Sequence, residues 1–81
     1  MTVKVFALST CPYCRMTRKY LDENEVDYDV AEVDQLAGQE REDAIAEVKN
    51  ISGGTSFPVI VIDEEVIVGF NKKRMKELLD L

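Results

Sequence analysis

Histidine is absent from this 81-residue chain, and cysteine occurs only twice. Because a structural zinc ion needs four ligands, usually Cys and His, these two facts exclude a closed zinc site within one chain. A zinc site shared between chains stays open. No run of about 18 apolar residues occurs, so the chain is not expected to span a bilayer. The N-terminal segment MTVKVFALST does not resemble a cleavable signal, and we expect a cytoplasmic protein.

Positive charge is also scarce, because 10 Lys and Arg stand against 16 Asp and Glu, for a net charge of −6. This balance argues against a general affinity for nucleic acid phosphates or anionic lipids, so no nucleic-acid or membrane partner is expected. The basic residues are nevertheless concentrated in two short stretches, residues 15–19 and 72–76.

The spacing of apolar residues predicts an α/β domain with the element order βαβαββα over residues 1–81. Strands are expected at residues 3–8, 27–33, 58–62 and 65–69, the last two forming a tight antiparallel hairpin. Helices are expected at residues 12–24, 38–50 and 71–79, with Asn71 capping the last. A strand-helix-strand start implies a parallel crossover, and the hairpin adds antiparallel strands, so we expect one four-stranded mixed sheet covered by helices.

The two cysteines lie two residues apart in STCPYCR, residues 9–15. A structural disulfide between them would close a loop of only a few residues and restrain little of the unfolded chain. A redox-active pair explains the spacing better, because Cys11 falls at the predicted start of a helix. There, unpaired N–H groups and the positive end of the helix dipole stabilise a thiolate.

The positions of the two sulfurs predict different roles for them. Arg15, in the next turn, is expected to lower the pKa of Cys11 further. Cys14 lies one turn further in, where its sulfur is shielded but still within reach of a disulfide with Cys11. We therefore expect Cys11 to attack a substrate and Cys14 to resolve the mixed disulfide. Pro12 stiffens the first turn, and Tyr13 is either ordinary surface cover or, as we favour, a contact for an incoming peptide.

Three segments, CPYC at residues 11–14, TSFPVIVID at 55–63 and VGFNKK at 68–73, together resemble the dithiol glutaredoxins. The resemblance covers essentially the whole chain and implies a single glutaredoxin-like domain with the thioredoxin fold. It implies thiol-disulfide oxidoreductase activity on protein disulfides or glutathione mixed disulfides. It also implies a cis bond before Pro58 and a backbone contact from Phe57 to the substrate. Ser56 and Phe57 stand where family members commonly carry Thr-Val.

The last loop departs from the family pattern. Many glutaredoxins have Gly-Gly-x-Asp there to hold the γ-glutamyl end of glutathione, whereas this chain has Val68-Gly69-Phe70-Asn71. Gly69 keeps one permissive position and Asn71 a capping side chain. The Gly-Phe pair is similar to small glutaredoxin-like redoxins that supply electrons to ribonucleotide reductase and are reduced by a thioredoxin reductase.

The resemblance implies a set of site residues and partners. Cys11 and Cys14 are the expected catalytic pair, and the expected substrate-binding residues are Pro12, Tyr13, Arg15, Ser56, Phe57, Pro58, Gly69, Phe70 and Asn71. We expect a monomer without bound cofactor or metal, with glutathione as co-substrate or a thioredoxin reductase as the alternative reductant. Glutaredoxin-like subunits that share an iron-sulfur cluster are the other alternative, and Pro12 counts against it.

Basic residues at the start of the last helix are not explained by helix stability, because the dipole disfavours cations there. With Arg15 and Lys19, the segment Lys72-Lys73-Arg74 is expected to form a positive rim near Cys11. The alternative is that these basic residues are simply part of the solvated surface. Such a rim would attract an anionic thiol or an acidic patch on a partner.

Overall fold

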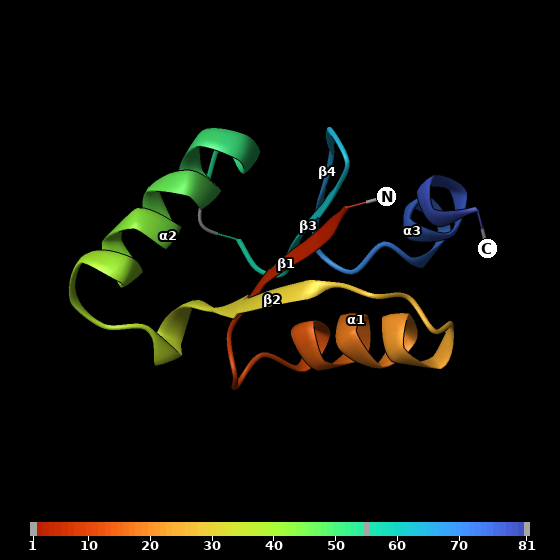
Figure 1. The fold of residues 1–81 in the computed structure, drawn as a ribbon, viewed down its shortest axis with the longest axis horizontal. Coiled ribbons are helices and arrows are strands. Elements are labelled where there is room, and N and C mark those ends of the chain that lie inside the picture. Colours follow the sequence, from red (N-terminus) through yellow and green to blue (C-terminus); the bar gives the residue numbers. More distant parts are fainter. Residues whose placement is uncertain (1, 55, 81) are drawn as a thin grey trace.

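The computed structural model describes residues 2–54 and 56–80. Its strands are β1 (Val3–Ala7), β2 (Asp29–Glu32), β3 (Val59–Ile62) and β4 (Glu65–Val68). Its helices are α1 (Pro12–Glu23), α2 (Gly38–Ser52) and α3 (Lys72–Leu79), with a short 3-10 helix η1 (Val33–Gln35) after β2. Figure 1 shows α2 on one side of the sheet and α1 and α3 on the other. The predicted element order is confirmed.

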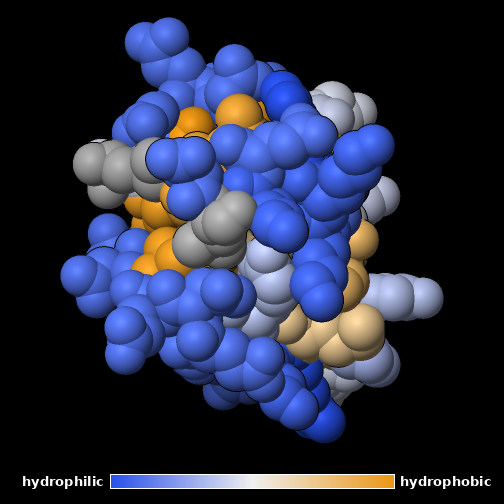
Figure 2. All heavy atoms as spheres, turned by 90° about the vertical axis from the view of Figure 1, so that its right-hand side faces the viewer, coloured by the Kyte–Doolittle hydropathy of each residue, from blue (hydrophilic) through white to orange (hydrophobic). Residues whose placement is uncertain are grey.

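The four strands form one mixed sheet in the order β2-β1-β3-β4. β1 pairs with β2 in parallel, and the other two pairings are antiparallel, as the sequence predicts. No helix among the described residues is long and apolar enough to cross a bilayer. Figure 2 shows that hydrophilic side chains cover most of the face that carries α3, with hydrophobic atoms visible between them.

Several element ends differ from the prediction, and each difference has a local cause. β1 ends at Ala7 because the N–H of Leu8 donates to the sulfur of Cys14 instead of joining a strand. β2 is shorter than expected, because only Asp29–Glu32 pairs with β1 before the chain enters η1. α2 continues beyond the expected end to Ser52 and stops at Gly53, whose φ of 77° suits a left-handed helix terminus.

Alternating side chains of the strands build a core on each face of the sheet. On the face of α1 and α3, Val5 and Ile60 pack with Leu21 and Met75 in one buried cluster. On the opposite face, Phe6 belongs to a second cluster with residues of α2. Because the central strands are buried on both faces, their sequences are almost continuously apolar.

The strand register brings four chain segments to one edge of the sheet. Ala7, at the end of β1, pairs with Glu32 at the end of β2. Val59, at the start of β3, pairs with Val68 at the end of β4, and β1 runs antiparallel to β3 with Phe6 opposite Val59. The loop that carries Cys11, the helix η1, residues 56–58 and residues 69–71 all leave the sheet at this edge.

Candidate active site

Cys11 occupies the N-cap of α1 in an extended backbone conformation, as predicted. Its sulfur accepts a hydrogen bond from the backbone N–H of Cys14 at 3.4 Å. Partial burial raises the pKa of the Cys11 thiol, but hydrogen bonds from the Cys14 thiol and from the N–H groups of Cys14 and Tyr13 outweigh it. The net effect is a pKa below the ordinary value for cysteine, so this sulfur favours the thiolate.

Cys14 lies one turn further along α1 with 1% of its surface exposed. Its sulfur accepts the N–H of Leu8 at 3.5 Å. Burial raises the pKa of Cys14 to about 11; the N–H of Leu8 opposes this, while Cys11 and the negative charge of Asp34 add to it. Both cysteines are free thiols in the structure. The pair thus combines an accessible sulfur that ionises readily with a buried sulfur that keeps its proton.

The expected role of Arg15 in lowering the pKa of Cys11 is not what the structure shows. Its guanidinium donates to the carbonyl of Ser9 at 3.5 Å, and the groups that lower the pKa are those of Cys14 and Tyr13. The arginine therefore contacts the loop before the nucleophile. Tyr13 is 60% exposed and Pro12 is also exposed, so both are accessible beside Cys11.

The Phe57–Pro58 peptide bond is cis, as the resemblance implies. Pro58 is buried, Phe57 is half-buried against both core clusters, and Ser56 is exposed. The antiparallel register places this segment beside the residues that follow β1 and lead to Cys11. The carbonyl of Pro58 accepts the N–H of Gly69 at 2.7 Å, which ties this segment to the loop before α3.

The loop at residues 69–71 contacts α1 through aromatic side chains. Gly69 has a φ of 85°, a conformation that other residues rarely adopt. The ring of Phe70 meets that of Tyr20 edge to face, with centroids 6.4 Å apart. Asn71 caps α3 as predicted, because its Oδ1 accepts the N–H of Arg74 at 3.1 Å. Beside this contact, a groove of about 320 Å³ lies between α1 and the start of α3, lined by Met16, Lys19, Tyr20, Glu23, Phe70 and Lys72.

The expected positive rim is only partly present. Arg74 pairs with Glu65 at 3.4 Å and with Glu77 at 3.5 Å, so its charge is directed away from the cysteines. Lys19 lies 3.9 Å from a carboxylate in the next turn of α1. Lys72 turns toward α1, where its ammonium lies 5.5 Å from the centre of the Tyr20 ring. Acidic neighbours therefore offset part of the charge that the sequence suggested.

Sequence reasoning missed a polar cluster behind the cysteine loop. The N–H of Ser9 donates to Oδ1 of Asp34 at 2.9 Å, and the Ser9 hydroxyl donates to Oδ2. Gln35 donates to the same hydroxyl at 3.1 Å. A serine shortly before the first cysteine and an aspartate after the second strand were the available signals. Their meaning depends on the parallel pairing of β1 and β2, which brings the two strand ends together.

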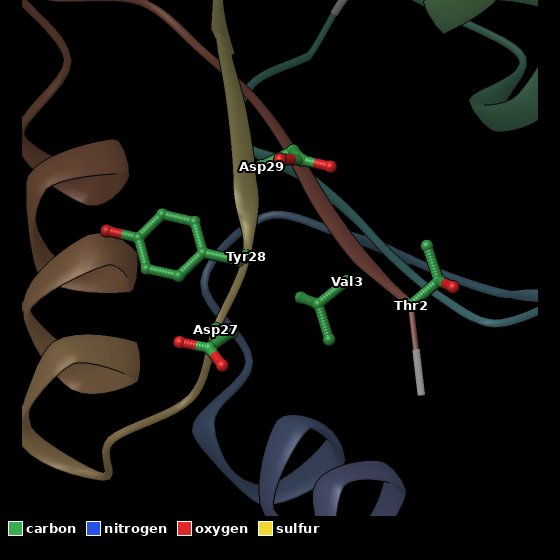
Figure 3. Close-up of a pocket in the computed structure, with 5 residues that line it drawn as sticks. All are labelled: Thr2, Val3, Asp27, Tyr28 and Asp29. Atoms are coloured by element: carbon green, nitrogen blue, oxygen red, sulfur yellow. The ribbon is translucent and has the colours of Figure 1, made fainter.

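A second pocket, of about 300 Å³, lies away from the cysteines. Figure 3 shows its lining from the beginnings of β1 and β2: Thr2, Val3, Asp27, Tyr28 and Asp29. The ring of Tyr28 points toward α1, where its hydroxyl donates to Asp22 at 3.0 Å. Because this pocket is at the opposite ends of the strands, it does not belong to the cysteine site.

Comparisons with known proteins agree with this geometry. Residues 3–67 match the Glutaredoxin family. A glutaredoxin-like 8.6 kDa protein in the rubredoxin operon of Clostridium pasteurianum is 37% identical over 96% of this chain and 97% of its own length. The glutaredoxin of Archaeoglobus fulgidus superposes with a TM-score of 0.91 at 40% identity, over 95% of this chain and 84% of that one. Methanosarcina acetivorans methanoredoxin gives a TM-score of 0.93 at 34% identity, over 99% and 85%. The chain therefore has the thioredoxin fold and belongs to the glutaredoxin family.

Proposed function

We propose that this chain is a dithiol thiol-disulfide oxidoreductase that acts on protein disulfides or glutathione mixed disulfides. The observation that carries the proposal is the contrast between its two thiols. Cys11 accepts hydrogen bonds at the start of α1 that lower its pKa, whereas burial raises the pKa of Cys14 to about 11. One sulfur is suited to attack, and the other to keep its proton until it is needed.

The proposed cycle has two exchange steps. The Cys11 thiolate attacks a substrate disulfide, forms a mixed disulfide with one half and releases the other half as a thiolate, which takes up a proton from water. Cys14 then loses its proton and attacks the Cys11 sulfur. The second half of the substrate leaves and is protonated, and a Cys11–Cys14 disulfide remains. The substrate disulfide gains two electrons and the cysteine pair loses two.

The substrate segment next to the reacting sulfur is proposed to lie along Phe57 and the cis Pro58. The strand register supports this location, because it places these residues beside the loop that carries Cys11. Tyr13 and Arg15 are proposed to border the substrate on the α1 side, and residues 69–71 on the other. The hydrogen bond from Gly69 to Pro58 supports treating the two segments as one surface.

Glutathione is the proposed reductant of the Cys11–Cys14 disulfide, with a thioredoxin reductase as the alternative. The loop before α3 supports a thioredoxin reductase. There Asn71 already caps the helix and Phe70 packs on Tyr20, so these side chains are less available to hold glutathione. Oxidised protein is offered either glutathione with glutathione reductase or thioredoxin reductase alone, and NADPH loss is followed. Turnover only with thioredoxin reductase would contradict the role of glutathione.

The roles of the two cysteines are tested by single substitutions. Cys11→Ser is expected to abolish reduction of every disulfide, because the attacking sulfur is gone. Cys14→Ser is expected to stop at the mixed disulfide with a protein substrate, which mass spectrometry detects as a covalent complex, while activity on glutathione mixed disulfides survives. Equal loss of activity with Cys11→Ser and Cys14→Ser on both substrates, without a trapped complex, would contradict the proposed order of attack.

A further inference from the structure

The segment Leu8–Ser9, which follows β1, contacts both cysteines through its backbone. The N–H of Leu8 donates to the Cys14 sulfur at 3.5 Å, and the carbonyl of Leu8 accepts the N–H of Cys11 at 3.2 Å. The carbonyl of Ser9 also accepts a hydrogen bond from Arg15. A displacement of this short segment would therefore remove a hydrogen-bond partner from each of the two cysteines.

Asp34, in η1 directly after the neighbouring strand β2, anchors this segment. Its two carboxylate oxygens accept the backbone N–H and the hydroxyl of Ser9. These hydrogen bonds lower the pKa of Asp34, so it carries a negative charge at neutral pH. Because its pKa is lowered, the Asp34 carboxylate is a weak base and is poorly suited to take the proton of Cys14.

The charge of Asp34 also acts on Cys14. Burial is the largest influence that keeps the Cys14 proton in place, and the titratable groups that add to it are Cys11 and Asp34. The N–H of Leu8, directly after β1, acts in the opposite direction. Cys14 belongs to a buried hydrophobic cluster that also contains Ile60 from β3, Ile67 from β4 and Met75 from α3.

The influences on the pKa of Cys14 change when Cys11 is part of a mixed disulfide. A disulfide sulfur carries no charge, so the contribution of the Cys11 thiolate disappears. Burial and the charge of Asp34 then remain to oppose ionisation of Cys14. Because only the thiolate attacks a disulfide, these two influences limit the rate at which Cys14 resolves the mixed disulfide.

We infer that Asp34 is a positioning residue that slows the resolving step: its hydrogen bonds to Ser9 fix the carboxylate behind the cysteine loop, and from there its charge opposes ionisation of Cys14 while Cys11 is bound to substrate. This inference rests on the proposed function. Asp34 makes the mixed disulfide longer-lived than the arrangement of the two sulfurs alone would make it. When Cys14 attacks, its proton goes to water and not to Asp34.

The two exchange steps can be separated with one equivalent of 5,5′-dithiobis(2-nitrobenzoate). The Cys11 thiolate attacks this reagent and releases a first coloured nitrothiobenzoate anion, leaving a mixed disulfide. Cys14 then loses its proton to solvent, attacks the Cys11 sulfur and releases a second anion. Stopped-flow absorbance therefore records attack as the first phase and resolution as the second.

The informative variant is Asp34→Asn, which removes the charge but keeps an oxygen that accepts the Ser9 N–H. The first phase is expected to stay unchanged, while the pH midpoint of the second phase falls by about 0.5 units or more. For each unit that the pKa of Cys14 falls, its thiolate fraction rises about tenfold and its intrinsic reactivity drops about threefold, for a net gain of about threefold at neutral pH.

Two further variants separate charge from hydrogen bonding. Ser9→Ala removes the hydroxyl donor and keeps the carboxylate charge, so the midpoint of the second phase should not fall. Asp63→Asn is the matched control, because Asp63 accepts the N–H of Thr2 at 2.9 Å, at the opposite end of β1. Both phases should be unchanged in this variant.

An unchanged or raised midpoint in Asp34→Asn would overturn the inference, as would a fall of about 0.5 units or more in Ser9→Ala, which keeps the charge. The Ser9→Ala result can be read even if Asp34→Asn does not fold. The first phase tests the proposed function separately. A first phase no faster than that of free cysteine at neutral pH would contradict the attacking role of Cys11, whatever the second phase does.

Discussion

At the scale of single residues, the main feature is that two identical side chains, one helical turn apart, have opposite acid-base behaviour. The difference arises from position, because the N-cap sulfur receives N–H groups while the sulfur in the next turn faces the apolar core. Desolvation favours the neutral thiol, and hydrogen-bond donors favour the thiolate. The local geometry of Cys11 and Cys14 is thus the basis for the proposed order of the two steps.

The raised pKa of Cys14 predicts an alkaline loss of stability in the reduced protein. The folded state holds this proton up to a pKa of about 11, above the ordinary value of 9.0. The stabilisation is therefore fully present below pH 9 and is lost as the pH rises through 11, for a total of about 1–3 kcal/mol. Urea unfolding of reduced protein between pH 8 and about 11.5 measures it.

Cys14→Ala provides the comparison for this measurement, because lysines and tyrosines that titrate in the same range are common to both proteins. The variant is expected to be less stable at pH 8, since a buried side chain is truncated. Its stability should then fall less steeply with pH than that of the parent. Parallel curves for the two proteins would show that burial does not hold the proton on Cys14.

Which site residues can be found from sequence depends on whether their partners are local. The N-cap position of Cys11 and the shielding of Cys14 follow from a helix that starts at Pro12, so a short stretch of sequence predicted them. The Ser9–Asp34 contact joins positions 25 residues apart and depends on strand pairing. Arg15 was misjudged although its partner is local, since its guanidinium reaches back to the Ser9 carbonyl and not to the Cys11 sulfur.

At the scale of elements, helix starts were predicted better than strand limits. Pro12 and Asn71 mark helix beginnings through their own chemistry, and both predictions are confirmed. Both ends of β2, predicted at residues 27–33, are set by how far β1 can pair with it, and no single segment of the sequence contains that limit. Gly53 marks the end of α2 in the sequence. The helix was nevertheless predicted to end at Asn50, whereas it continues to Ser52.

The end of α2 offers a test with an adjacent control. Gly53 has a φ of 77°, where a side chain is strained even though no atom lies within 4 Å of an added Cβ. Gly53→Ala should therefore destabilise the protein by about 1–2 kcal/mol. Gly54 has equally open surroundings and no positive φ, so Gly54→Ala should cost little. Equal losses in urea unfolding would contradict the left-handed terminus.

At the scale of the whole molecule, the sheet places the chemistry at one edge. The register brings the loop after β1, the helix η1, the cis Pro58 segment and the loop before α3 to the same side. The fold class was predictable, because the periodicity of each segment and the order of the segments agree. The pairing of Arg74 with Glu65 was not predictable, because it forms only once α3 has docked beside β4, whereas the pair with Glu77 lies within α3 itself.

The proposed mechanism requires that the folded chain, and not the CPYC segment alone, makes Cys11 acidic. Ultraviolet titration of thiolate formation in the reduced protein, native and in denaturant, tests this directly. In the native protein we expect the first thiolate to form below the pH of an ordinary thiol, with the second near pH 11. In denaturant both should titrate together at about pH 8.5. A first native midpoint equal to the unfolded one would show that folding does not make Cys11 acidic.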